Sequence, residues 1–253
     1  MDIKEIENIL PEITFLLKEI AKDIPLNKST IFSEKDKDIK LSTDLLLHQQ
    51  IVDMLKNFGD IAVLSEEDDK GVDFSKNKEM LWIIDPLDGS LNHLRKIPLS
   101  CISISLFRGI TPVMGIIYDY NRNEMFTGII GAGAWLNTVP IKVSSVRDLG
   151  QGVLCTGFPS YRDFSEAAIY KFVTDIRKWK KVRLLGSAAL SLAYVASGRT
   201  DGYIEEDIRI WDVAAGLAIV KAAGGEIACK PNIRANFVTA KATNASIPIG
   251  ELI

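Results

Sequence analysis

Cysteine is scarce in this chain of 253 residues. Its three cysteines, Cys101, Cys155 and Cys229, lie far apart and show no C-x-x-C spacing. An odd number of scattered cysteines excludes a disulfide framework and provides no paired zinc ligands. Because their surroundings are apolar or strand-like, we expect reduced core residues of a cytoplasmic protein.

Long apolar runs are also absent. No stretch of about 18 or more apolar residues occurs, and the first residues lack the basic start and apolar run of a signal peptide. We therefore expect a soluble protein without a membrane partner.

Positive charge is not in excess either. There are 30 Lys plus Arg against 33 Asp plus Glu, for a net charge of -3, and the basic residues are scattered. No nucleic-acid partner is therefore expected. A local phosphate site stays open, because a bound metal ion can attract an anion within an acidic protein.

The chain is 47% hydrophobic, enough for one large domain or two joined halves. Helical spacing in residues 3–20 and 42–58 is followed by short apolar strands over 61–130, which predict an antiparallel meander. After Gly150 strands and helices alternate. With no linker visible, we expect two halves of one compact unit, 1–145 and 146–253, with the active site between them.

The most informative segment lies at residues 82–90, where an apolar strand ends in two carboxylates, Asp85 and Asp88. Such a turn can aim both side chains and the Leu87 carbonyl at one point, giving the all-oxygen environment that Mg²⁺ prefers. Gly89 and Ser90 then offer backbone N–H groups to a phosphate if a helix begins there. Alone, however, this pentapeptide is more typical of an ordinary β-turn.

Two weaker acidic signals accompany it. Glu66 follows the apolar strand 61–64, although an acidic cluster by itself is usually a solvated loop. Asp212 opens a helix of small residues and by itself is more typical of an N-cap. In this order along the chain, the three signals together predict one acidic, phosphate-directed centre.

These segments resemble the inositol monophosphatase family, part of a lithium-sensitive group that includes fructose-1,6-bisphosphatases and nucleotide 3'-phosphatases. Residues 65–67, 82–92 and 211–216 match its three signatures in order, and the resemblance covers nearly the whole chain. The resemblance implies an α+β fold, a layered αβαβα sandwich, and a homodimer.

The resemblance also implies two to three Mg²⁺ ions per active site. The implied ligands are all oxygen donors: Glu66, Asp85, the Leu87 carbonyl, Asp88 and Asp212. Asp85 would bridge the first two ions, and a third, weaker ion would lie near Glu66. Glu66 and Ser90 would orient the attacking water, with Asp44 supporting Ser90. Ser90 stands where the family commonly has Thr, but it keeps the hydroxyl.

Substrate contacts follow from the same resemblance. The phosphate side would involve Asp88, Gly89 and Ser90, and the backbone of Gly186, Ser187 and Ala188 would lie beside the ring. Glu205 matches the position that takes a substrate hydroxyl, although residues 205–207 also fit a charged turn. Arg209 could meet a second phosphate, although a surface salt bridge is the more common use of such a residue.

Three further features stay open in the sequence. His93 stands where the family usually has Phe, which we interpret as a surface or packing variation rather than a proton-transfer group. His48 is interpreted as a residue of a helix face. Residues 28–40 are rich in Lys and Asp, typical of a mobile loop that could close over the metals or of an inert solvated loop.

The leading hypothesis is a phosphoric monoester hydrolase that splits inositol monophosphate into inositol and phosphate with a metal-activated water. Fructose 1,6-bisphosphate, cut at C1, is a second possible substrate. The alternatives are a 3'(2'),5'-bisphosphate nucleotidase and a regulatory partner-binding protein that retains the phosphatase fold.

Overall fold

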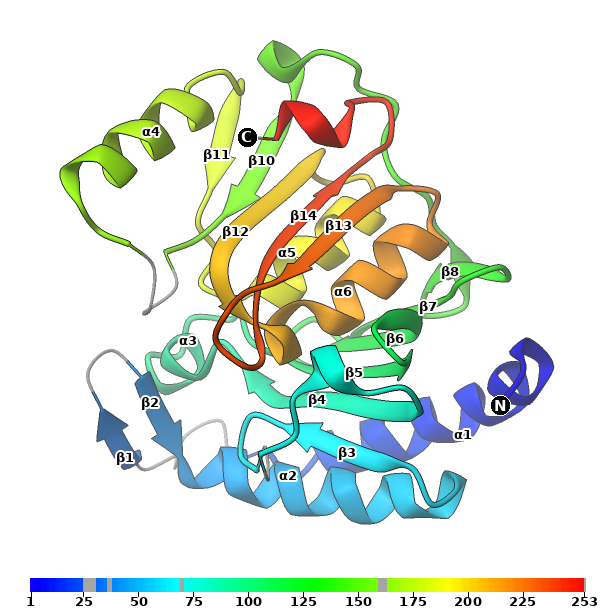
Figure 1. Ribbon diagram of the computed structural model, residues 1–253. Coiled ribbons are helices and arrows are strands. Elements are labelled where there is room, and N and C mark those ends of the chain that lie inside the picture. Colours follow the sequence, from blue (N-terminus) through cyan, green and yellow to red (C-terminus); the bar gives the residue numbers. More distant parts are fainter. Residues whose placement is uncertain (25–30, 36–37, 69–70, 159–162, 253) are drawn as a thin grey trace.

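The computed structural model describes residues 1–24, 31–35, 38–68, 71–158 and 163–252. Its two large sheets alternate with layers of helices (Figure 1). The first helical layer contains α1 (Ile3–Ala21) and α2 (Ser42–Leu55). The middle layer contains α5 (Ala188–Ala196) and α6 (Ile210–Ala222), and α4 (Glu166–Ile176) lies outside the second sheet. The predicted α+β layered sandwich is confirmed.

The first sheet has seven strands in chain order, β3 to β9. Their bounds are Ala62–Ser65, Met80–Asp88, Cys101–Arg108, Thr111–Asp119, Glu124–Ile129, Gly133–Leu136 and Val139–Pro140. From β4 onward all neighbours are antiparallel, as the meander prediction requires.

The prediction of an antiparallel meander is wrong for β3, which pairs with β4 in parallel. The connection 66–79 is too long for a hairpin turn, so the chain crosses back and enters β4 from the same end as β3. In this register Ser65 lies opposite Ile84. The residues that follow β3 and end β4 therefore share one edge of the sheet.

The second sheet has the order β11-β10-β12-β14-β13. Its strands are Lys181–Arg183, Val153–Thr156, Gly202–Arg209, Phe237–Thr243 and Glu226–Pro231 in that order. β10 is parallel to both neighbours, and β14 is antiparallel to both of its own. The break between the sheets lies between Pro140 and Val153, and the boundary at 145/146 stays a prediction.

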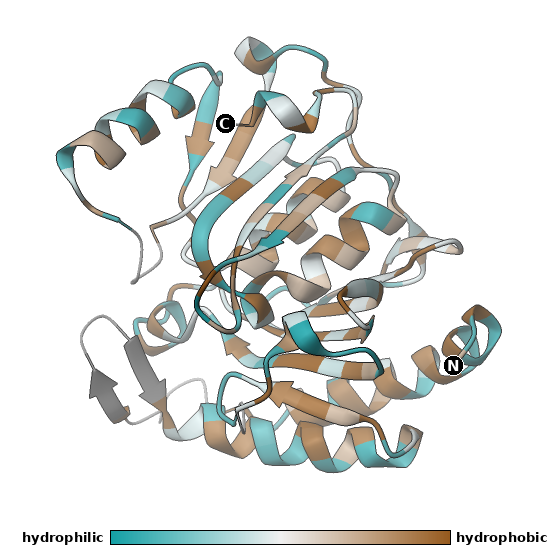
Figure 2. Cartoon of the chain, in the orientation of Figure 1, coloured by the Kyte–Doolittle hydropathy of each residue, from teal (hydrophilic) through white to brown (hydrophobic). Residues whose placement is uncertain are grey.

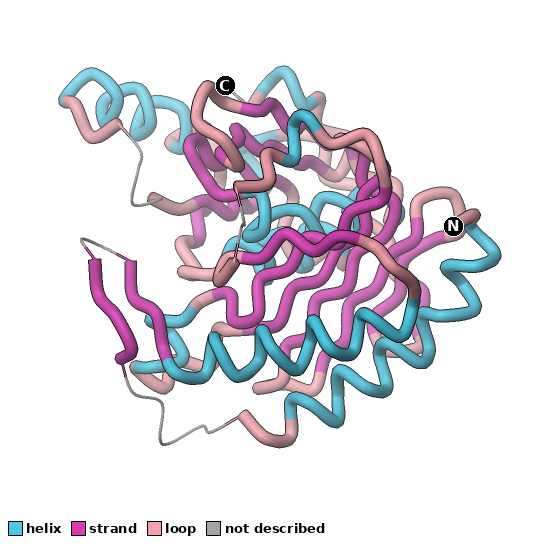
Figure 3. Tube along the Cα trace, turned by 60° about the horizontal axis from the view of Figure 1, so that its bottom comes forward, coloured by secondary structure: helices cyan, strands magenta, loops and turns pink. Residues whose placement is uncertain are grey.

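The two N-terminal helices lie across the outer face of the seven-stranded sheet (Figure 3). Helix α1 packs against the sheet through one apolar face, on which Ile6, Ile13 and Leu17 are fully buried. Hydrophilic and hydrophobic residues accordingly alternate along α2 in Figure 2. Among the described residues, no helix combines the length and apolar character needed to cross a membrane.

Part of the predicted loop 28–40 is a two-stranded hairpin. β1 (Ile31–Lys35) pairs with β2 (Asp38–Leu41) in antiparallel fashion. Residues 28–30 and 36–37 lie outside the described residues. The loop prediction is therefore wrong for the two strands and stays a prediction for the remainder.

Helix α6 is buried nearly all round because both sheets cover it. Its close approach to the first sheet depends on glycine. A Cβ on Gly115 of β6 would lie 2.2 Å from the backbone oxygen of Ala215, and one on Gly128 of β7 would lie 2.8 Å from Ile219 Cα. The glycines of β6 and β7 thus set the distance of this helix from the sheet.

We expect Gly115→Ala to lower the free energy of unfolding by about 3 kcal/mol or more, because the added methyl group meets backbone that cannot turn aside. Urea denaturation would measure this loss. Gly250→Ala is the matched control, since nothing lies within 4 Å of its Cβ position. Equal stability of the two variants would contradict the packing argument.

Candidate active site

The carboxyl-end edge of β3 and β4 brings together residues from three elements. Glu66 directly follows β3, and its backbone N–H donates to the Ile84 carbonyl at 3.3 Å. Asp85 lies within β4, and Asp212 arrives in the first turn of α6. Carboxylate oxygens of Glu66, Asp85 and Asp212 all lie within 4.8 Å of one another. Arg209, rather than Asp212, occupies the N-cap position of α6, so the N-cap alternative is wrong.

Electrostatics in this group favour a cation. Burial first, and then the charges of Glu66, Asp88 and Asp212, raise the pKa of Asp85 well above its usual range. Lost solvation and the charges of Glu66, Asp88 and Glu205 likewise raise the pKa of Asp212. Acidic groups held this closely repel one another unless a cation is bound or a proton is taken up. The all-oxygen donor set fits Mg²⁺.

Asp88 has a different setting from the other predicted ligands. The β4–β5 register shifts between Asp85 and Asp88, which redirects the end of the strand. Asp88 Oδ2 accepts hydrogen bonds from the Ser187 hydroxyl and, at 2.9 Å, from the Ala189 N–H. Burial raises its pKa to about 6, against the opposing effect of these donors. Asp88 lies outside the group of three, and its role as a ligand stays a prediction.

This contact joins β4 of the first sheet to the start of α5. Ser187 is the N-cap of α5, and its hydroxyl accepts from the Leu190 N–H at 3.2 Å while donating to Asp88. Ala188 is the first residue of the helix. The Cys101 thiol lies 3.7 Å from the same Asp88 oxygen. No pattern in the sequence indicated that Ser187 would donate a hydrogen bond to a predicted metal ligand.

Ser90 and Asp44 lie in contact, and their roles toward the attacking water stay a prediction. Ser90 begins the short helix α3 (Ser90–Leu94), and its hydroxyl donates to the Leu87 carbonyl at 2.9 Å. Asp44 Oδ1 lies 3.4 Å from the same hydroxyl. The other Asp44 oxygen accepts from the Leu41 N–H at 2.6 Å, which fixes the carboxylate at the start of α2. The Leu87 carbonyl keeps a second lone pair for a metal ion.

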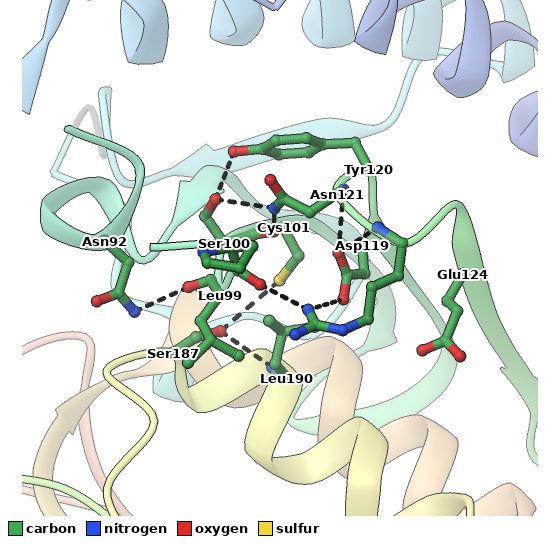
Figure 4. Close-up of polar contacts among 12 residues, drawn as sticks. Asn92, Leu99, Ser100, Cys101, Asp119, Tyr120, Asn121, Glu124, Ser187 and Leu190 are labelled. Carbon is green, nitrogen blue, oxygen red and sulfur yellow. Dashed lines mark hydrogen bonds and ion pairs between the residues drawn. The ribbon is translucent and has the colours of Figure 1, made fainter. Parts of the chain in front are cut away.

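Asn92 ties α3 to the segment before α5, and its contact with Leu99 is drawn in Figure 4. Its amide nitrogen lies 2.8 Å from the carbonyl oxygens of both Leu99 and Leu185, and 3.2 Å from that of Gly186. Gly89 has a φ of +85°, and a Cβ there would lie 2.7 Å from the Leu99 oxygen. Asn92 ends the matched segment 82–92 but received no role from the sequence, because its partners are distant in the chain.

The two histidines have structural partners. His93 is 6% exposed, and its Nδ1 lies 2.9 Å from the Tyr120 hydroxyl, which also contacts Ser100. The packing interpretation therefore holds, and the surface interpretation is wrong. His48 Nδ1 lies 2.8 Å from the Ser65 hydroxyl, inward from the solvent-facing side of α2.

Glu205 is a buried residue of β12, with 6% of its surface exposed. The charged-turn interpretation is therefore wrong at this position. The β12–β14 register shifts only after Glu205. A Cβ on Gly157 would lie 2.6 Å from Glu205 Oε1, so the missing side chain at Gly157 makes room for the carboxylate.

Arg209 ends β12 and packs over aromatic rings. Its guanidinium carbon lies 3.9 Å from the ring centroid of Phe237 and 5.0 Å from that of Trp211. This is cation–π geometry. The charge of Arg209 also lowers the pKa of Asp212 against the larger opposing effects.

Residues 5–239 match the inositol monophosphatase family. The chain is 39% identical to the "Nus factor SuhB" of Xylella fastidiosa over 214 residues, which cover 84% of this chain and 75% of that protein. The inositol monophosphatase from Anabaena (Nostoc) sp. PCC 7120 is 32% identical, with a TM-score of 0.78 over 94% of this chain and 90% of that one. The extragenic suppressor protein suhB from Bartonella henselae is 28% identical, with a TM-score of 0.75 and 93% coverage of both chains.

We expect Asp212→Asn to stabilise the metal-free protein increasingly as pH rises. The folded pKa of Asp212 is raised, so its ionisation opposes folding above the unfolded value of about 3.9. The variant's advantage in free energy of unfolding should be smallest near pH 4, grow as pH rises towards the folded pKa, and level off above it. Urea denaturation with a chelator would measure it.

The control for this pH series is Asp60→Asn, which changes an exposed carboxylate outside the site. Saturating Mg²⁺ should reverse the order, because only the wild type keeps the full ligand set. Parallel stability curves for wild type and Asp212→Asn across the pH range would contradict the electrostatic account.

Proposed function

The chain belongs to the inositol monophosphatase family, and we propose that it is a Mg²⁺-dependent phosphomonoesterase that hydrolyses inositol monophosphate to inositol and phosphate. The observation that carries this proposal is the approach of Glu66, Asp85 and Asp212 within 4.8 Å. Like charges brought together at low solvation are unfavourable without a cation. A fold that nevertheless holds them together supports a metal-binding use.

The proposed ligands extend this group to Glu66, Asp85, the Leu87 carbonyl, Asp88 and Asp212, for two to three ions. Mg²⁺ bound there would polarise the phosphate and lower the pKa of a water molecule. Ser90, held between Leu87 and Asp44, would orient that water together with Glu66. No covalent intermediate on the protein is required.

The substrate side is proposed to comprise residues from the second sheet and α5. The buried Glu205 would accept a hydroxyl of the polyol, beside the backbone of Gly186, Ser187 and Ala188. Arg209 could meet a second phosphate, which keeps fructose 1,6-bisphosphate and nucleotide 3'(2'),5'-bisphosphates as further substrates to be tested. The homodimer implied by the resemblance stays a prediction.

The names of the relatives favour a second candidate. Relatives from several bacteria, at 36–39% identity, are called "Nus factor SuhB". A partner-binding role of the kind that this name indicates could accompany hydrolysis or replace it. Such a role would use surfaces outside the acidic group and would survive its loss.

We expect Mg²⁺-dependent phosphate release from inositol 1-phosphate, with fructose 1,6-bisphosphate and adenosine 3',5'-bisphosphate measured in parallel to rank the substrates. Asp85→Asn should lower kcat/KM at least about a hundredfold, since loss of even an outer-shell partner costs 10–100-fold at metal sites. Asp60→Asn should match the wild type. We also expect lithium to inhibit. If no phosphate ester is hydrolysed, the phosphatase proposal is wrong.

Complementation in cells separates the two candidates. A deletion phenotype that Asp85→Asn fully rescues would show that the cellular role needs the fold but not hydrolysis. Rescue by wild type and Asp60→Asn, but not by Asp85→Asn, is the result that the phosphatase proposal predicts. Matched expression of the variants would be checked by immunoblotting.

A further inference from the structure

Tyr203 is a buried polar residue beside the acidic group to which neither motif nor family position assigned a role. It lies on β12, two residues before Glu205, and alternation along a strand places both side chains on the same face. Tyr203 is 0% exposed. Its hydroxyl has no hydrogen-bond partner among the described residues.

An unpartnered buried hydroxyl is uncommon, because a polar atom taken out of water normally finds a partner in the protein. The charged groups that act on it are the carboxylates of Glu205, Asp212 and Asp88. Burial, followed by the charges of Glu205, Asp212 and Asp88, raises the pKa of Tyr203 well above its usual range. The hydroxyl therefore keeps its proton at neutral pH and can donate.

Glu205 is the strongest charged influence on Tyr203. The closeness of the Glu205 carboxylate to the Tyr203 hydroxyl contributes to the raised pKa of Tyr203. The two groups nevertheless do not meet the geometry of a regular hydrogen bond. Gly157 leaves room on another side of the carboxylate, where a Cβ would lie 2.6 Å from Oε1 and 3.0 Å from Oε2. Glu205 is thus set in a closely fitted position with an unused donor beside it.

We propose that Tyr203 is a positioning residue that donates to Glu205 when a polyol phosphate binds, so that the carboxylate is oriented toward a substrate hydroxyl. This inference rests on the proposed function and specifies its substrate class as phosphates with a hydroxyl close to the ester. Neither atom needs to move far, because both belong to the same strand face. A phosphate ester without such a hydroxyl gains nothing from the contact.

The test compares Tyr203→Phe with wild type on inositol 1-phosphate and on p-nitrophenyl phosphate, which has no hydroxyl beside its ester. We expect KM for inositol 1-phosphate to rise roughly five- to tenfold, the loss of one charge-assisted hydrogen bond, with kcat little changed. Kinetics with p-nitrophenyl phosphate should be unaffected. The melting temperature should not fall, because the variant removes a hydroxyl that has no partner in the free protein.

Tyr118→Phe is the matched control. Tyr118 is a buried tyrosine of β6 whose hydroxyl donates to Asn123 Oδ1 at 3.0 Å, away from the acidic group. This variant should lower the melting temperature and leave KM for both substrates unchanged.

Three results would overturn the inference. Unchanged KM for inositol 1-phosphate in Tyr203→Phe would show that the hydroxyl does not act through Glu205. An equal loss with both substrates would assign Tyr203 to the common phosphate or metal chemistry instead. Absence of hydrolysis of both substrates by the wild type would remove the proposed function itself, and with it this inference.

Discussion

Repulsion among closely spaced carboxylates is the constraint on which the rest of the structure depends. Glu66, Asp85 and Asp212 come from a loop, a strand and a helix, and nothing local in the chain would keep them within 4.8 Å. Their mutual repulsion acts to separate the elements that carry them. The fold resists this through extensive packing, because α6 is covered by both sheets and Gly115 lets its backbone approach β6 closely. A bound cation would convert the opposed charges into ligands.

Asp88 extends that constraint to the junction of the two sheets. The strand that carries Asp85 ends three residues later in a carboxylate held at the start of α5 by Ser187 and Ala189. Asn92 makes a parallel connection from α3 to Leu185. A change in the position of α5 would therefore move the Asp88 carboxylate at the end of β4. The site is best described as a property of the junction rather than of either half.

The sequence predicted those parts of the site that depend on local patterns. The turn after residue 84 and the small-residue helix after Trp211 carry their signals within about ten residues, and the matched family segments supplied their order. The parallel pairing of β3 with β4 escaped prediction because a strand's direction relative to its neighbour depends on the path of the connection, not on its own residues. Glu205 was ambiguous for a similar reason: three acidic residues in a row fit a turn until the pairing of β12 with β14 buries the first. Asn92 and Ser187 act on partners more than 90 residues away in the chain, so no local pattern could reveal them.

The distribution of the site over the two sheets separates its chemistry from its selectivity. The carboxylates at the edge of β3 and β4, with Ser90 and Asp44, surround the place where a phosphate and its metal ions would lie. Glu205 and Tyr203 come from β12 instead, and they are the residues proposed to act on the alcohol part of the substrate. Substitutions on β12 are therefore expected to change the preferred alcohol without disturbing most of the proposed metal ligands. The exception is Asp212, because α6 begins directly after β12. This arrangement accounts for the way in which the three matched segments identify the family without identifying a substrate, because the residues proposed for the phosphate chemistry are not those proposed to contact the alcohol.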